Sequence, residues 1–162
     1  MLMLARQNIY IYIAYMPVNE ALIDLARFSD QLDVLQSDPN TRIMGSIGRM
    51  VIAQKAVNNP YVEFHNRVEA GLRIGGSDLD VLGASDAIIE AATVAGNVFI
   101  DTQAFDDTDV SIRNRDGAWY LHSHEVGFDE PIHSQLMEPV KGSIEGIDIV
   151  TVPLLTHQLM HR

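Results

Sequence analysis

The segment Val62-Glu-Phe-His-Asn-Arg-Val-Glu-Ala-Gly-Leu-Arg-Ile74 is the stretch of this chain that most clearly predicts its fold class. Apolar side chains alternate with polar ones along it, and Asn66 is the one break in the apolar series. This alternation predicts a half-buried β-strand that is longer than the usual length of about five to six residues. Its other face carries both signs of charge, so we expect water or another subunit to cover it, and its side chains are Glu63, His65, Arg67, Glu69 and Arg73.

On the N-terminal side of this segment, the pattern predicts a strand followed by a helix. Asn8–Met16 alternates isoleucine with tyrosine and alanine, which is typical of a strand covered on both faces. A helix is expected from Asn19 to about Gln36, because its leucines recur close to one face. Ile43–Ala56 is ambiguous: its two glycines argue against a helix, and its second half fits either a strand or a helical turn.

On the C-terminal side, short elements follow one another closely, and Asp116-Gly117 is a strong signal for a β-hairpin. Asp86–Val94 fits either a helix capped by Ser85 or a strand rich in small residues. The other expected elements are a short acidic and apolar alternation at Ser77–Leu82, strands at Val98–Thr102, Val110–Asn114, Ala118–Glu125 and Ile144–Leu155, and a helical turn at Thr156–Arg162.

Together these elements predict a β-rich α+β fold. We expect an N-terminal strand and helix, followed by an antiparallel sheet curled into a barrel or a sandwich. No repeat, low-complexity stretch or linker interrupts the chain, so residues 1–162 are predicted to form a single domain.

The charge of the chain narrows its possible partners. The formal net charge is -11, and only 11 Lys and Arg residues are spread over the 162 residues. A nucleic-acid backbone requires clustered Lys and Arg, so no nucleic-acid partner is expected. The apolar run at Ile9–Met16 is too short to span a bilayer, so no membrane partner is expected either. The predicted location is the cytoplasm, or a larger particle assembled there.

The histidines near the C-terminal half are candidate metal ligands. His122-Ser123-His124 would place two imidazoles on the same face of a strand, a spacing that can hold one divalent metal. Asp129 or His133 would supply a third ligand, which would leave a position for water and allow metal-assisted chemistry. The alternative is that the two histidines face solvent or pair with carboxylates.

A second candidate is the segment Gly76-Ser-Asp-Leu-Asp-Val81, which resembles the Ser-Asp-x-Asp strand of nucleotidyltransferases. The resemblance implies that Asp78 and Asp80 hold magnesium beside a triphosphate, with Asp101 on a later strand as the third carboxylate. Members of that family also have a Gly-Ser turn about ten residues upstream that cradles phosphate, and the Glu69-Ala-Gly-Leu72 stretch does not supply one. An exposed acidic strand edge is the alternative.

Two classes of function remain open at this point. The first is a non-catalytic protein that works by assembling, with itself or with a protein partner, as a homo-oligomer or a component of a virion or other particle. The second is a metal-dependent enzyme or a small-ligand-binding barrel that uses the His-x-His site. We expect the first, with no cofactor, whereas the second would need one divalent metal.

Overall fold

In a computed structural model of the protein, residues 28–55, 78–105, 108–144 and 146–160 are described. The strands predicted at Val62–Ile74 and Asn8–Met16 lie outside these residues, so both stay predictions. Residues 19–27 of the helix predicted from Asn19 to about Gln36 also lie outside the described residues. The structure shows α3 (Ser29–Gln36), with Phe28 at its N-cap, and α3 ends at the predicted residue.

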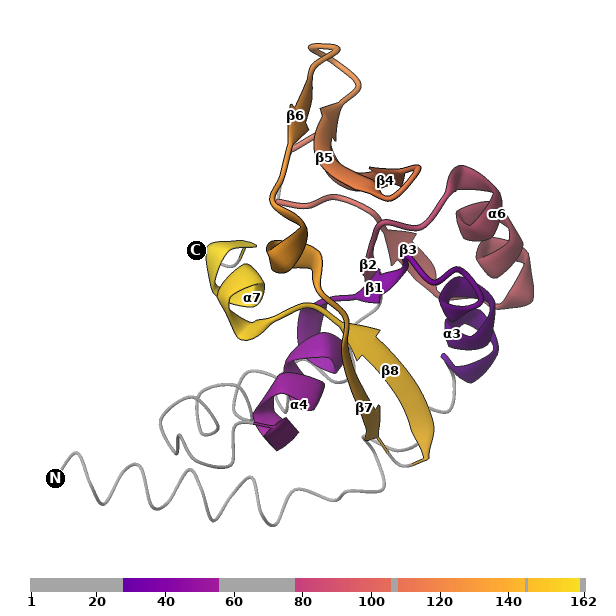
Figure 1. Ribbon diagram of the computed structural model, residues 1–162. Helices are drawn as coiled ribbons and strands as arrows, with labels where there is room; N and C mark the ends of the chain where they lie inside the picture. The colour runs from indigo at the N-terminus through magenta and orange to yellow at the C-terminus, as the bar shows by residue number, and fades with distance from the viewer. Residues whose placement is uncertain (1–27, 56–77, 106–107, 145, 161–162) are drawn as a thin grey trace, which may run out of the picture.

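A mixed three-stranded sheet lies at the centre of the molecule, in the order β1 (Arg42–Ile43), β2 (Asp78–Leu82) and β3 (Phe99–Asp101) (Figure 1). Strands β1 and β2 are antiparallel. Strands β2 and β3 are parallel, because α6 (Asp86–Ala95) carries the chain back between them. This β2–α6–β3 unit aligns the starts of β2 and β3 at one edge of the sheet.

Helices α3 and α6 pack together on one side of this sheet, and α4 (Gly45–Lys55) packs against a second sheet (Figure 1). That sheet is the antiparallel pair β7 (Val140–Ile144) and β8 (Ile147–Thr151). The side chains buried between these elements form the main core, which includes Leu32, Leu35, Ile43, Val51, Leu79, Val81, Ile100 and Ile149.

A third sheet forms the top of the view in Figure 1, with β4 (Val110–Arg115), β5 (Ala118–Ser123) and β6 (Asp129–Pro131) in that order. The predicted hairpin joins β4 to β5, and Asp116 and Gly117 have φ values of 53° and 86°. Positive φ at both central residues is the type I′ geometry that matches the twist of a hairpin. The hairpin prediction is therefore confirmed.

Arg42 of β1 joins the central sheet to the third one. Its buried guanidinium donates to the carbonyls of Met137 (3.0 Å) and Pro39 (2.8 Å) and lies 5.2 Å from the ring centroid of Trp119. Burial lowers the pKa of Arg42 from its ordinary value, and the charge of Asp38 acts in the opposite direction. A second core cluster surrounds this contact: Met44, Leu82, Ala104, Ile112, Trp119, Met137 and Val152.

The fold is thus α+β, as predicted. Of the expected barrel or sandwich, no closed barrel is formed by the residues that the structure describes, and the sandwich stays a prediction. The sheets there contain two or three strands each, and none of them closes. The central sheet is also not purely antiparallel, because α6 links two parallel strands. Ser85 caps α6 by accepting from the Ile88 N–H at 3.3 Å, which confirms the helical alternative for Asp86–Val94.

Two further segments differ from expectation. Ile43–Ala56 was expected to resist helix formation at its glycines, yet α4 begins at Gly45 and includes Gly48. A Cβ at Gly48 would lie 2.4 Å from the Ile43 carbonyl oxygen and 2.7 Å from Thr151 Oγ1, so close packing requires a glycine there.

The predicted strand Ile144–Leu155 is divided. Gly146, with φ of 80°, turns the chain between β7 and β8, and α7 (Leu154–Met160) begins after Pro153. Within the described ranges, no helix has both the length and the apolar character needed to cross a bilayer.

Candidate functional site

Three carboxylates converge on the central sheet. Asp78 and Asp80 alternate with the buried Leu79 on β2, and the parallel register pairs Asp80 with Asp101 on β3. Each carboxylate offers one oxygen, and these oxygens lie within 4.8 Å of one another. Among the residues that the structure describes, this is the one group of three acidic or histidine side chains that meets this distance.

The backbone of the strands explains why the three acids share one face. In a strand, successive side chains point to opposite faces, so Leu79 and Ile100 enter the core while their acidic neighbours point away from it. Asp80 and Asp101 are half-buried and Asp78 is exposed. The Asp101 carboxylate also accepts from the Gln103 N–H at 2.9 Å, which fixes the orientation of its side chain.

The start of helix α4 lies directly beside Asp80. The Met44 N–H donates to the Asp80 carbonyl at 2.8 Å, and Gly45 follows with φ of 61°. A Cβ on Gly45 would lie 2.0 Å from Asp80 Oδ2, so no larger side chain fits there while the carboxylate keeps its position. This contact brings Gly45-Ser46 and the N-terminus of α4 to the acidic group.

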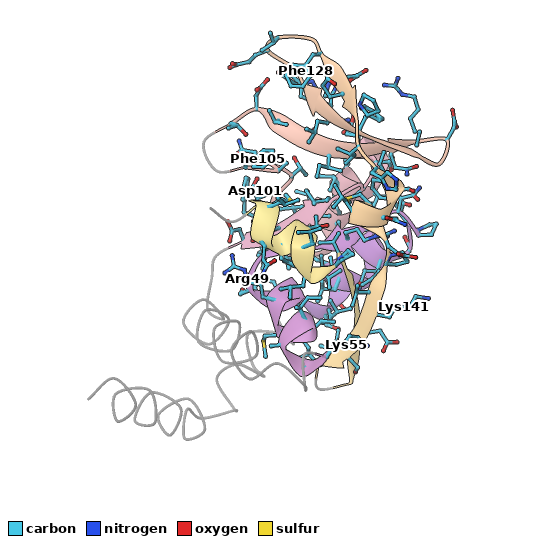
Figure 2. The ribbon with its side chains drawn as sticks, turned by 60° about the vertical axis from the view of Figure 1, so that its left-hand side comes forward. Arg49, Lys55, Asp101, Phe105, Phe128 and Lys141 are labelled. Carbon is cyan, nitrogen blue, oxygen red and sulfur yellow. The ribbon has the colours of Figure 1, made fainter. Side chains whose placement is uncertain are left out.

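A helix N-terminus exposes backbone N–H groups and a partial positive charge, which makes it a favourable place for phosphate. Arg49 is buried on α4, one turn after Gly45, and Figure 2 shows Arg49 and Asp101 at the same edge of the molecule. The acidic group therefore adjoins a helix end that favours anions.

The histidines form a separate arrangement on the third sheet. His122 Nδ1 lies 2.7 Å from Asp129 Oδ1, and His122 Nε2 lies 3.2 Å from His124 Nδ1. His124 Nε2 lies 3.0 Å from Arg113 Nη2, and Arg113 also contacts Asp86 at 3.2 Å. The structure thus brings His122, His124 and Asp129 into one chain of contacts.

The nitrogen that carries the proton in each histidine follows from the groups at the two ends of this chain of contacts, Arg113 and Asp129. A guanidinium only donates, so His124 Nε2 accepts from Arg113 and the proton of His124 is on Nδ1. His124 then donates to His122, whose own proton is on Nδ1 and points to the Asp129 carboxylate. In this arrangement, hydrogen bonds use the nitrogen atoms that a metal would need.

His133 lies apart from that chain of contacts. Its Nδ1 accepts from the Gln135 N–H at 3.2 Å and caps the short 3-10 helix η1 (Ser134–Met137). Metal binding by His122, His124, Asp129 and His133 stays a prediction, and the pairing of His122 with a carboxylate matches the alternative reading of these residues.

Asp109 binds the residues on either side of His124, at the end of β5. It accepts from Ser123 Oγ at 2.7 Å and from the Glu125 N–H at 2.6 Å. These two hydrogen bonds favour the charged form and lower the pKa of Asp109 below its ordinary value of 3.8. Ser123 is fully buried, so the turn that carries His124 is anchored to the third sheet.

Comparison with known proteins assigns no family to this chain. No protein-family profile, curated protein sequence or solved structure gives a significant match. The function must therefore be argued from the residues of the two arrangements described above.

Proposed function

We propose that the protein is a divalent-cation-dependent nucleotidyltransferase, whose reaction takes place at Asp78, Asp80 and Asp101. The observation that carries this proposal is the convergence of the three carboxylates from two parallel strands, with the N-terminus of α4 packed against Asp80. The Ser-Asp-x-Asp resemblance requires a Gly-Ser turn beside the acids. Gly45-Ser46 supplies that turn from far upstream in the sequence.

The donor set fits magnesium. Carboxylate oxygens are hard ligands, and Mg²⁺ in phosphoryl-transfer enzymes is bound through one or two carboxylates together with phosphate oxygens of the substrate. The three carboxylates each offer an oxygen close enough to the others to share one cation. When bound, a divalent cation would neutralise phosphate oxygens and stabilise the charge that develops during transfer.

The position of each residue on the sheet suggests its role in binding the donor and the acceptor. The N–H groups at the start of α4 bind and orient phosphate oxygens of a nucleoside triphosphate. Asp78 and Asp80 lie between that helix and β3, so the phosphorus to be attacked lies over β2. Asp101, on the strand farthest from α4, accepts the proton of the acceptor hydroxyl.

The proposed nucleotidyl transfer needs no oxidant or reductant. The acceptor oxygen forms a bond to the α-phosphorus, and the bond from that phosphorus to the oxygen of pyrophosphate breaks. Pyrophosphate leaves with the electron pair of the broken bond, and the proton of the acceptor passes to Asp101. Catalysis of this kind consists mainly of positioning and charge stabilisation.

Mn²⁺ titration of the purified full chain, followed by calorimetry, tests the proposal. We expect stoichiometric binding that weakens by at least about tenfold in Asp80→Asn and Asp101→Asn, since each variant removes one charged ligand. The matched controls are Asp86→Asn, an exposed acid outside the group, and His122→Ala. The same samples are assayed for pyrophosphate release from each of the four Mg²⁺-nucleoside triphosphates.

The Asp→Asn variants should fold, because asparagine has nearly the same size and shape as aspartate. Thermal unfolding without metal checks that each variant is folded. Equal Mn²⁺ affinity in wild type, Asp80→Asn and Asp101→Asn would rule the proposal out. Loss of binding in His122→Ala alone would instead favour the His-x-His site.

The assembly function expected from the sequence stays a prediction. No contact between copies is described, and an enzyme can also form a homo-oligomer. Its test belongs to the molecule as a whole and is given in the Discussion.

A further inference from the structure

The face of the central sheet that carries the carboxylates also carries an exposed aromatic ring. Phe99 and Asp101 are two residues apart on β3, so they point to the same face. The register pairs Phe99 directly with Asp78 on β2. The Phe99 side chain is 69% exposed, whereas Ile100 between it and Asp101 is 9% exposed and belongs to the core.

An exposed phenyl ring beside three carboxylates can serve as the apolar wall of a ligand site. A phenylalanine buries a large apolar area when it is covered, and ligand sites combine apolar or aromatic walls with a few polar groups. Phe99 supplies the aromatic surface and the three carboxylates supply the polar groups. The strand pairing sets them side by side without any rearrangement of the backbone.

The side on which the ring lies identifies what it contacts. Gly45 touches Asp80 from the β1 side of β2, whereas Phe99 adjoins Asp78 from the β3 side. The order β1-β2-β3 therefore sets the start of α4 and the phenyl ring on opposite sides of β2. If donor phosphates bind at α4, the ring lies on the side from which the acceptor approaches.

Resting on the proposed function, we propose that Phe99 packs against the acceptor and selects a small hydroxyl compound with a planar or apolar face. The charge of the chain favours this class over a nucleic-acid strand, because 22 acidic residues oppose 11 basic ones. A nucleic-acid strand would bring many phosphates against this acidic chain and be repelled along its length, whereas an uncharged acceptor would not be. The phosphates of the donor differ, because the start of α4 and the bound cation would hold them. Packing on Phe99 would hold the acceptor hydroxyl close to Asp101.

Pyrophosphate release from Mg²⁺-ATP by the full chain, with 2-phenylethanol or propan-1-ol as the added acceptor, tests the inference. Mass spectrometry identifies the adenylylated alcohol. In the wild type we expect half-saturation at a concentration about tenfold lower for the aryl alcohol, in line with the usual contribution of one aromatic stacking contact. Phe99→Ala should lose this preference, and Phe99→Tyr should keep it.

Val94→Ala is the matched control, because Val94 is an exposed apolar residue of α6 (86% exposed) that does not belong to this face. A wild type that releases pyrophosphate but shows no preference for the aryl alcohol overturns the inference and leaves the proposed function intact. So does a preference that survives in Phe99→Ala. A Phe99→Ala variant that loses affinity for Mg²⁺-ATP instead would assign the ring to the donor base. Failure of metal binding and of pyrophosphate release in the wild type rejects both proposals.

Discussion

Gly45 is the residue on which the shape of the acidic group most depends. It combines a positive φ of 61° with a position where a Cβ would lie 2.0 Å from Asp80 Oδ2. The positive φ strains the backbone of any larger residue at this position. The short distance means that a Cβ there would push the Asp80 carboxylate aside. The two effects can be separated by comparison with a glycine that has only the first.

We expect Gly45→Ala to lower the free energy of unfolding by about 1–3 kcal/mol, the usual cost of a strained backbone position. It should also weaken Mn²⁺ binding by at least about tenfold, because Asp80 is displaced from the other two carboxylates. Chemical denaturation and Mn²⁺ titration measure the two effects separately.

Gly127→Ala is the control for this variant. Gly127 has a similar φ of 68°, but nothing lies within 4 Å of its Cβ position. Gly127→Ala should lower the free energy of unfolding by a similar amount, because its backbone is strained in the same way. It should keep the Mn²⁺ affinity of the wild type. If Gly45→Ala also keeps that affinity, Gly45 does not position Asp80 for metal binding.

At the level of single residues, local spacing predicted part of the site. Asp78 and Asp80 lie two apart on a strand, which places them on one face from the sequence alone. The position of Gly45-Ser46 beside the acids was not predicted, because a Gly-Ser turn was sought just upstream of Ser77, whereas Gly45-Ser46 reaches Asp80 through the pairing of β1 with β2. A contact between residues so distant in the sequence leaves no periodic signal, although a Gly-Ser pair after a short apolar run was visible.

The elements around the site depend on a buried glutamine that links two helices to β3. Gln31 of α3 donates from Nε2 to the carbonyls of Ala92 (3.1 Å) and Val98 (2.9 Å), and its Oε1 accepts from the Val98 N–H at 3.2 Å. Because Gln31 is fully buried, no water molecule can take its place as the hydrogen-bond partner of these backbone groups. The contact fixes the loop that leads into β3.

Gln31→Leu should therefore lower the free energy of unfolding by about 2–4 kcal/mol, because it leaves buried backbone donors and acceptors without partners. The measurement is urea denaturation, with Gln54→Leu on the exposed side of α4 as the control. Gln31→Leu should also lower the affinity for Mn²⁺, since Asp101 follows on β3. A variant as stable as the control would show that the link carries little of the stability.

The elements themselves were predictable to different degrees, for physical reasons. The hairpin at Asp116-Gly117 and the Ser85 cap of α6 depend on local chemistry. The hairpin was predicted, and the helix capped by Ser85 was one of the two alternatives for its segment. Helix α4 was not predicted, because Gly48 is disfavoured in an isolated helix and is required here by close packing. The parallel pairing of β2 and β3 was missed for a similar reason, since it depends on how α6 packs rather than on either strand.

For the whole molecule, the open question is whether the chain assembles, as its sequence suggested. Leu155 and Leu159 of α7 are four residues apart, so they share one face of that helix. They are 56% and 43% exposed, which leaves two large apolar side chains adjacent on the surface. Self-association through this face would bury them, and the formal net charge of -11 would oppose it at low ionic strength.

We therefore expect the wild-type chain to sediment as a species larger than a monomer, with association that strengthens as salt screens the charge. The variant Leu155→Glu with Leu159→Glu should shift the equilibrium to monomers, because it adds two charges to the surface that would be buried. Val126→Glu is the control, since Val126 is 75% exposed but lies on the third sheet's β5–β6 connection. A wild type that stays monomeric at high concentration and high salt contradicts the assembly prediction. That result would leave the proposed enzyme unaffected, because its three carboxylates and the start of α4 all come from a single chain.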